Sequence, residues 1–486
     1  MLNTVKITLL SYIVKKFLLY YYVCMKAWEY TCQKTRNAVP RLLSEEEQTW
    51  IMLQEAEKSI DALLRAQWSS NVPGSAAPES VIAGAVQSME NMGYRVDEAE
   101  KLLEQGLAAL EQGDMGALNI LTARIYRLME TFPRNDDSPY RMYVVYQDFE
   151  AHARSVSFPQ PVSVTVDGDD FRKKTRAAWL GRLAGGALGT ALEGYTTGQL
   201  RKKFGEIRDY VRPPNTYNDD ITYEIAFLAA AAQKGRSMCS ADIADQWLAL
   251  VPTGWSAEQI ALDNLRRGIY PPESGSWKNP YREWIGAQMR GAICGQIVPG
   301  NPREAARLAW MDGVISHAGN GVLGEVFNAV LASAAFVEPD ARRLVDQAIA
   351  LIPADSEYHS VLRFAREAVG KGSFDSAWAA CEERFKQYNW IHAYPNAAAE
   401  LVALWFGNGD FDETMHLISM CGQDVDCNAA QLGAVLGAQG GMAAVPERWY
   451  LPLGTTIKTY LRGHKEIELD DLVGQTLTAA AGFSSI

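Results

Sequence analysis

The stretch G-R-L-A-G-G-A-L-G-T-A-L-E-G, residues 181–194, decides the fold class of this chain. It is apolar and rich in small residues, a composition typical of a buried helix that packs closely against its neighbours. The same character extends over residues 171–465, where β-branched alternating runs are nearly absent. Apolar helical faces are expected in segments 222–233, 241–249, 283–297, 302–314, 323–336, 341–351 and 427–440. We therefore predict an all-α domain over residues 171–465, whose helices are largely buried.

A smaller helical unit is predicted before this domain. Residues 41–131 contain amphipathic stretches, the first opened by a capping box of Ser44 and Glu47. Residues 132–170 are richer in proline and include a short β-like run at 162–166, so we interpret them as a linker. Residues 466–486 are interpreted as a C-terminal tail.

The N-terminal segment, residues 1–40, is harder to interpret. Residues 7–25 are apolar and aromatic, but Lys15 and Lys16 interrupt the run, which is unfavourable for a membrane span or a signal peptide. Three interpretations remain open: a docking helix, a poor membrane anchor, or translated upstream sequence with the true start at Met25. We expect a cytoplasmic protein without a membrane role.

Composition narrows the classes of function that are open to the chain. The chain has 486 residues and a net charge of -12, which disfavours binding to nucleic acids because their phosphates would be repelled. Seven cysteines are scattered without a C-x-x-C pair, a pattern typical of reduced thiols in a cytosol.

Two acidic clusters are the strongest chemical signal. Asn218-Asp219-Asp220 precedes one predicted helix, and Asp424-Val425-Asp426 precedes another. A single acidic helix start is explained by the helix dipole alone. Two such starts about 200 residues apart are explained together if they meet around Mg²⁺, which prefers carboxylate oxygens. A D-x-D pair on an extended segment would direct both carboxylates to the same side.

Residues 175–462 resemble the ADP-ribosylglycohydrolase family in four blocks that occur in the family's order. They are the stretch 181–194, Tyr217–Thr222 (Y-N-D-D-I-T), Gly286–Arg290 (G-A-Q-M-R) with Ser316-His317 beyond it, and Gly422–Ala430 (G-Q-D-V-D-C-N-A-A). The resemblance implies an orthogonal all-α fold that holds two Mg²⁺ ions, with Mn²⁺ as an alternative metal.

The resemblance also implies the site residues. The implied metal ligands are Asn218, Asp219, Asp220, Asp424, Asp426 and Cys427, and the implied catalytic residues are Glu193 and Asp424. Asn218 and Cys427 stand where the family usually has threonine, and a thiol is a softer ligand that suits Mg²⁺ poorly. Gly186 replaces an aspartate often seen in the first block. Candidate substrate-binding residues are Arg290, Ser316, His317, Asn320, His392 and Asn396, although a buried ion pair for Arg290 and a helix cap for Asn396 are equally good explanations.

The implied activity is Mg²⁺-dependent hydrolysis at the ribose anomeric carbon of an ADP-ribosyl group on a protein or small molecule. Two alternatives remain open: hydrolysis of a smaller ribosyl or N-glycosyl metabolite, and a non-catalytic binding or regulatory protein that keeps the fold. In the last case residues 41–131 would be the part that docks a protein partner.

Overall fold

The computed structural model describes residues 25–484, so the predictions for residues 1–24 lie outside the described residues. The chain divides into two compact units, Met1–Ala62 and Leu63–Ile486. Among the described residues, no helix is both long enough and apolar enough to cross a membrane.

The predicted all-α fold is confirmed: helices dominate the described chain, and the strands form only short two-stranded antiparallel ribbons, β1–β2, β3–β4 and β5–β6. The strands are β1 (Ser70–Asn71), β2 (Pro78–Glu79), β3 (Tyr195–Thr196), β4 (Gly422–Gln423), β5 (Thr456–Lys458) and β6 (Glu466–Glu468). The helices up to residue 155 are α2 (Ala27–Arg36), α3 (Trp50–Trp68), α4 (Val81–Asn91), α5 (Asp97–Gln112), α6 (Met115–Met129), η1 (Pro139–Met142) and α7 (Phe149–Ser155). The helices that follow are α8 (Asp169–Gly189), α9 (Thr197–Phe204), α10 (Asp220–Lys234), η2 (Gly235–Ser237), α11 (Ser240–Leu250), α12 (Ser256–Arg266), α13 (Glu273–Ser276), η3 (Gln288–Arg290), α14 (Gly291–Gln296), α15 (Pro302–Gly313), α16 (Asn320–Ala335), α17 (Ala341–Ile349), α18 (Glu357–Val369), α19 (Phe374–Arg384), α20 (Ala393–Gly407), α21 (Phe411–Cys421), α22 (Val425–Gly440), η4 (Gly441–Ala443), α23 (Glu447–Tyr450), η5 (Leu451–Leu453) and α24 (Leu469–Ser484).

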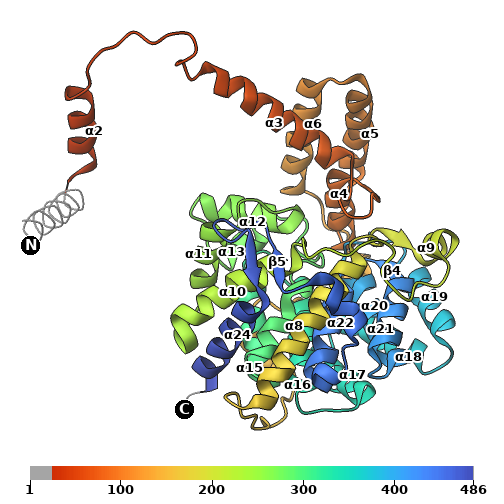
Figure 1. Cartoon of the computed structure of the whole chain (residues 1–486). Coiled ribbons are helices and arrows are strands. Elements are labelled where there is room, and N and C mark those ends of the chain that lie inside the picture. Colours follow the sequence, from red (N-terminus) through yellow and green to blue (C-terminus); the bar gives the residue numbers. More distant parts are fainter. Residues whose placement is uncertain (1–24, 485–486) are drawn as a thin grey trace, which may run out of the picture. The chain divides into compact units, whose positions relative to one another are not determined.

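Helices α8 and α22 run side by side through the large domain (Figure 1). From Ala177 to Gly189, every residue of α8 is buried, and α16 is buried along its whole length. Such helices are largely apolar on every side because other helices surround them, as the small-residue composition predicts.

Helices α3 to α6 build a separate hydrophobic core. Trp68, Ile82, Leu118 and Ile125 are buried in it, and the Trp68 indole donates a hydrogen bond to Thr122 Oγ1 at 2.7 Å. This small helical core is fastened to the large domain by buried hydrogen bonds. The Trp284 indole donates to Ser88 Oγ at 2.6 Å, and the Tyr281 hydroxyl donates to the carbonyl of Val81 at 3.1 Å.

Three local predictions differ from the structure. The helix expected directly after Ser44 begins only at Trp50, although the Ser44 amide does donate to Glu47 Oε2 at 3.0 Å. The run at 162–166 forms no strand, and the Val162 amide donates instead to the carbonyl of Gly300 at 2.9 Å. The predicted tail contains β6 and α24, and α24 packs against α8, where the Trp179 indole donates to Thr476 Oγ1 at 2.9 Å.

Candidate active site

Contacts at glycine bring α8 and α22 together backbone to backbone. A Cβ atom at Gly181 would come within 2.1 Å of the Gly433 carbonyl oxygen, and one at Gly185 within 2.1 Å of the Ala429 carbonyl oxygen. At Gly189, the last residue of α8, a Cβ atom would lie 2.1 Å from the Asp426 amide nitrogen. The C-terminal end of α8 therefore lies directly against the N-terminal turn of α22.

The segment after α8 is tied to the segment before α22. Strands β3 and β4 pair Tyr195 with Gln423, and the Gly194 amide donates to the Gln423 carbonyl at 2.8 Å. Glu193 and Asp424 each adjoin this short ribbon in sequence. The pairing therefore places the glutamate of the first block beside the second acidic cluster.

The first acidic cluster meets the second through side chains. Asp219 is the N-cap of α10 and Asp220 its first residue, as the sequence predicts. Asn218 Nδ2 donates to Asp426 Oδ2 at 3.3 Å, and the Cys427 thiol donates to Asp220 Oδ1 at 3.1 Å. Two segments some 200 residues apart are thus joined at one place.

The D-x-D segment is helical rather than extended. Asp424 is the N-cap of α22, and Asp426 lies in its first turn. Asn396, near the start of α20, fixes this segment because its Oδ1 accepts hydrogen bonds from the Asp424 amide at 3.0 Å and from Asn428 Nδ2 at 2.7 Å. Its own amide group donates to the carbonyls of Trp390 and His392 at 2.7 and 2.9 Å. Asn396 therefore positions Asp424.

The cluster concentrates negative charge in a buried place. Asp220, Asp424 and Asp426 are all buried, and burial raises the pKa of each carboxyl above its usual range. Neighbouring carboxylates raise the pKa of Asp220 and Asp424 further. Burial, and then the charges of Asp426 and Asp424, also hold the pKa of Glu193 well above its usual value. Like charges this close are unfavourable unless a cation compensates them.

The donor atoms fit a divalent cation. Ligand atoms of Asp424, Asp426 and Cys427 lie within 4.8 Å of one another. Asp220 Oδ2 and Asp426 Oδ1 are buried and accept no hydrogen bond from the described part of the chain. Buried carboxylate oxygens that lack donors are suited to a metal ion, and most of this set are the hard oxygen ligands that Mg²⁺ or Mn²⁺ prefers.

A family model described as ADP-ribosylglycohydrolase matches residues 167–480. The chain belongs to the ADP-ribosylglycohydrolase family. Membership confirms the resemblance found in the sequence and supports a glycohydrolase role. The family is generally metal-dependent, which agrees with the buried Asp-Asp-Cys group.

Two further comparisons accompany this match. An uncharacterised protein of Archaeoglobus fulgidus is 26% identical over 294 residues, covering 57% of this chain and 91% of that relative. A solved structure, an ADP-ribosylglycohydrolase-related protein complex, aligns at 21% identity with a TM-score of 0.45. The alignment covers 65% of this chain and 99% of the chain in that structure.

Three of the candidate substrate-binding residues form a buried polar network in this glycohydrolase-family domain. The Arg290 guanidinium pairs with Asp312, lies 3.4 Å from Glu258 Oε1, and donates to Ser316 Oγ at 3.0 Å. Ser316 Oγ is in turn 2.8 Å from His317 Nδ1. Burial, and then the charge of Arg290, hold the pKa of His317 well below its usual value, so the imidazole is neutral. These side chains bond to one another, although His317 Nε2 has no hydrogen-bond partner among the described residues. Their contact with substrate stays a prediction.

Asn320 and His392 are likewise engaged within the protein. Asn320 Nδ2 donates to Glu283 Oε1 at 3.0 Å. His392 is the N-cap of α20, where its Nδ1 accepts from the Tyr394 amide at 3.2 Å. Their role as substrate ligands also stays a prediction.

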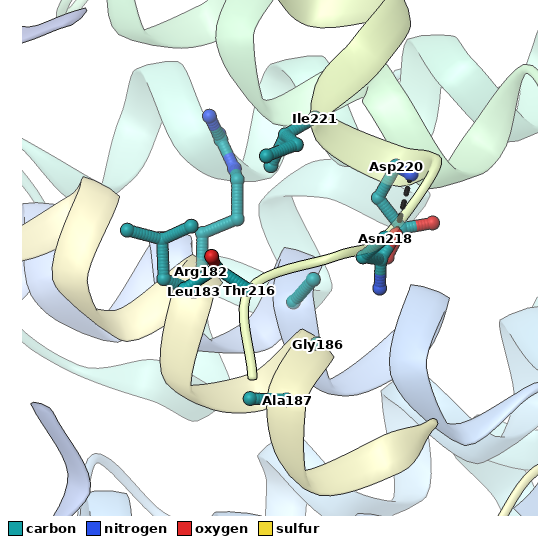
Figure 2. A pocket seen from close by; sticks show the side chains of 9 residues that line it. Arg182, Leu183, Gly186, Ala187, Thr216, Asn218, Asp220 and Ile221 are labelled. Carbon is teal, nitrogen blue, oxygen red and sulfur yellow. Dashed lines mark hydrogen bonds between the residues drawn. The ribbon is translucent and has the colours of Figure 1, made fainter. Parts of the chain in front are cut away.

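An ion pair that the sequence reasoning missed borders the carboxylates. Arg182 Nη1 lies 2.6 Å from Glu224 Oε2, and both side chains are fully buried. Figure 2 shows Arg182 and Asp220 lining one pocket between α8 and the segment that enters α10. The signal was present in the sequence, because Glu224 follows Asp220 by four residues and so lies one helical turn further along the same face of α10.

Proposed function

We propose that the protein is a divalent-metal-dependent glycohydrolase that cleaves the bond at the ribose anomeric carbon of an ADP-ribosyl substrate. The observation that carries the proposal is the meeting of two acidic helix starts beside Glu193, within a chain of the ADP-ribosylglycohydrolase family. A protein that only binds a partner gains nothing from buried carboxylates that repel one another.

In this proposal, Asp219, Asp220, Asp424 and Asp426 hold Mg²⁺ or Mn²⁺, and Asn218 and Cys427 complete the set. The metal supplies a Lewis acid that orients ribose hydroxyls and polarises water. Asn218 keeps two ligands in register, since its side chain accepts from the Asp220 amide at 2.6 Å and donates to Asp426.

Glu193 and Asp424 are the catalytic carboxylates of the proposal. In the reaction, the oxygen of water bonds to the anomeric carbon while the bond from that carbon to the leaving group breaks. One of these two carboxyl groups receives a proton from the water, and the other, protonated before the reaction, donates its proton to the leaving group as the bond to the anomeric carbon breaks. The negative charges of the cluster also stabilise the oxocarbenium-like transition state.

A surface pocket favours an ADP-ribosyl substrate over a smaller riboside. The pocket is lined by Tyr217, Lys458, Thr459, Gly463, Lys465 and Glu466. Tyr217 lies two residues before Asp219, and its side chain is exposed. A diphosphate would be attracted by the two lysines, and an adenine ring can stack on a tyrosine. A riboside without these groups would leave the pocket unused.

The proposal is tested by a hydrolysis screen of the full chain. The substrates are ADP-ribosyl-arginine, ADP-ribosyl-serine, free ADP-ribose derivatives and simple ribosides, each with Mg²⁺, with Mn²⁺ and with excess EDTA. We expect metal-dependent release of ADP-ribose from at least one ADP-ribosyl compound. Hydrolysis of simple ribosides alone would favour the metabolite alternative, and binding of ADP-ribose without any hydrolysis would favour the non-catalytic one.

The matched variants are Asp424→Ala and Asp471→Ala. Asp471 is an exposed aspartate in the first turn of α24, so its removal should leave the rate unchanged. Asp424→Ala should abolish hydrolysis and leave the thermal midpoint of the metal-free protein unchanged or higher, because it removes a buried charge from a repelling cluster. Unchanged activity in Asp424→Ala would remove this residue from the mechanism.

A further inference from the structure

A short hairpin of the N-terminal helical part reaches the candidate active site. Its strands are β1 and β2, and its tip is the segment Val72–Ala77. Val72 and Ala77 are buried, and the Val72 amide donates to the Ala77 carbonyl at 2.9 Å. This tip lies outside residues 167–480, the part that matches the family.

The backbone of the tip lies against Glu193. A Cβ atom at Gly74 would come within 2.1 Å of the Thr190 carbonyl oxygen and 2.9 Å of Glu193 Oε1. A Cβ atom at Gly194 would lie 2.5 Å from that of Ala77. The tip therefore occupies the space next to the carboxylate that we place at the reaction.

Three side chains of the large domain hold the hairpin. Arg212 Nη1 donates to the Gly74 carbonyl at 2.6 Å, and the Tyr195 hydroxyl donates to the Ser75 carbonyl at 3.0 Å. At the base of the hairpin, the Trp255 indole donates to Glu79 Oε1 at 3.0 Å. Arg212 also donates to Thr190 Oγ1 at 3.3 Å, so one side chain joins the tip to the end of α8. A loop held by this many hydrogen bonds forms a fixed boundary of the site.

We propose that the Val72–Ala77 tip limits the size of the leaving group, so that the enzyme cleaves ADP-ribose from small molecules and excludes folded proteins. This inference rests on the proposed function. An acid or base must reach the water or the leaving group at the anomeric carbon. Since the tip lies directly against Glu193, any group attached to that carbon has to fit beside the tip. A folded protein would place its own surface where the tip lies.

The test compares one linkage in two settings. ADP-ribosyl-serine is supplied as the free amino acid conjugate and on a folded protein, and kcat/KM is measured for each with Mg²⁺. In the test variant, Val72–Ala77 is replaced by Asn-Gly, which can close a two-residue turn between β1 and β2. The same pair of measurements with ADP-ribosyl-arginine applies if serine conjugates are not cleaved.

We expect the wild-type enzyme to prefer the free conjugate by at least a hundredfold. Shortening the tip should lower this preference at least tenfold, mainly by raising kcat/KM for the protein conjugate. An equal rate on both conjugates in the wild type, or an unchanged preference in a folded shortened variant, would overturn the inference.

A second variant keeps the test decisive if the shortened chain fails to fold. Tyr195→Phe combined with Arg212→Gln removes two hydrogen bonds to the tip and should shift the preference about threefold in the same direction. Tyr270→Phe is the control, because it removes a tyrosine hydrogen bond to Asp245 away from the tip and should leave the preference unchanged. If the wild type cleaves no ADP-ribosyl compound, the proposed function itself fails. If it does cleave one and the preference does not move, only the role of the tip fails.

Discussion

Adding a single methyl group to α8 should separate the two helices that carry the site. Gly185→Ala places a Cβ atom 2.1 Å from the Ala429 carbonyl oxygen, a backbone atom that cannot rotate away. In a helix interior, alanine is favoured over glycine by about 1 kcal/mol, whereas overpacking a tight contact costs about 1–3 kcal/mol or more. Because the contact is between backbones, we take the upper end, and we expect a net loss of about 2 kcal/mol in the free energy of unfolding.

Gly474→Ala is the matched control. Gly474 lies inside α24, and no atom lies within 4 Å of a Cβ atom built there. The same substitution should therefore stabilise the protein by about 0.5–1 kcal/mol. The assay is urea unfolding followed by circular dichroism, with the wild type and both variants measured at one pH. A Gly185→Ala protein as stable as the wild type would refute backbone contact between α8 and α22.

Three further substitutions test individual groups. Burial raises the pKa of Glu400 to about 8 from the ordinary 4.5. The folded protein therefore holds this proton more tightly than the unfolded chain does. The resulting stabilisation is complete below pH 4.5 and is lost as the pH rises to about 8. Glu400→Gln should therefore stabilise the protein by about 3 kcal/mol at pH 7 and by nothing at pH 4.5 in urea titrations, and a pH-independent difference would contradict the shifted pKa. Asn396→Ala leaves the buried Asp424 amide without its acceptor, so unfolding titrations should show a loss of about 3 kcal/mol, and a loss below about 1 kcal/mol would show that Asn396 does not position the D-x-D segment. Cys427→Thr replaces a soft donor with a hard one, so calorimetry should show the affinity for Mg²⁺ rising at least tenfold relative to that for Cd²⁺, whereas an equal change for both metals would exclude the thiol as a ligand.

Local patterns made the helices predictable. The expected segments 302–314, 341–351 and 427–440 correspond to α15, α17 and α22 within a few residues. Each carries its own apolar face, and any neighbouring helix can cover such a face. The helical character of these segments is therefore set locally. The all-α class followed from the same patterns.

The segment 283–297 was not predictable in this way. A single helix was expected there, but the structure has turns, η3 and the short α14. The backbone at its start bonds elsewhere, since Trp284 pairs with His392 and the Ile285 amide donates to the Ile391 carbonyl at 2.8 Å. A contact between positions about 100 residues apart competes with the local helix, and no local pattern reveals it.

The site residues likewise divide into those that local patterns indicate and those that depend on distant contacts. The acidic helix starts could be picked out from residue types, and Glu193, at the end of the glycine-rich stretch, from the resemblance to the family. The hairpin tip at Gly74 could not, because residues 69–78 carry only the signals of an ordinary loop, and their contact with Glu193 depends on distant parts of the chain. The spacing from Asp220 places Glu224 on the same face of α10, but its ion pair with Arg182 depends on the fold.

The central claim is that the two acidic clusters together form one divalent-metal site. Calorimetric titration with Mg²⁺ and Mn²⁺ tests this claim most directly. The wild type is compared with Asp426→Asn, which keeps the size of the side chain and removes its charge, and with Asp471→Asn as an exposed control. We expect the wild type and the control to bind metal and to gain thermal stability from it, while Asp426→Asn binds at least tenfold more weakly. If the wild type binds neither metal, or if Asp426→Asn binds as tightly as the wild type, the metal site described here is contradicted.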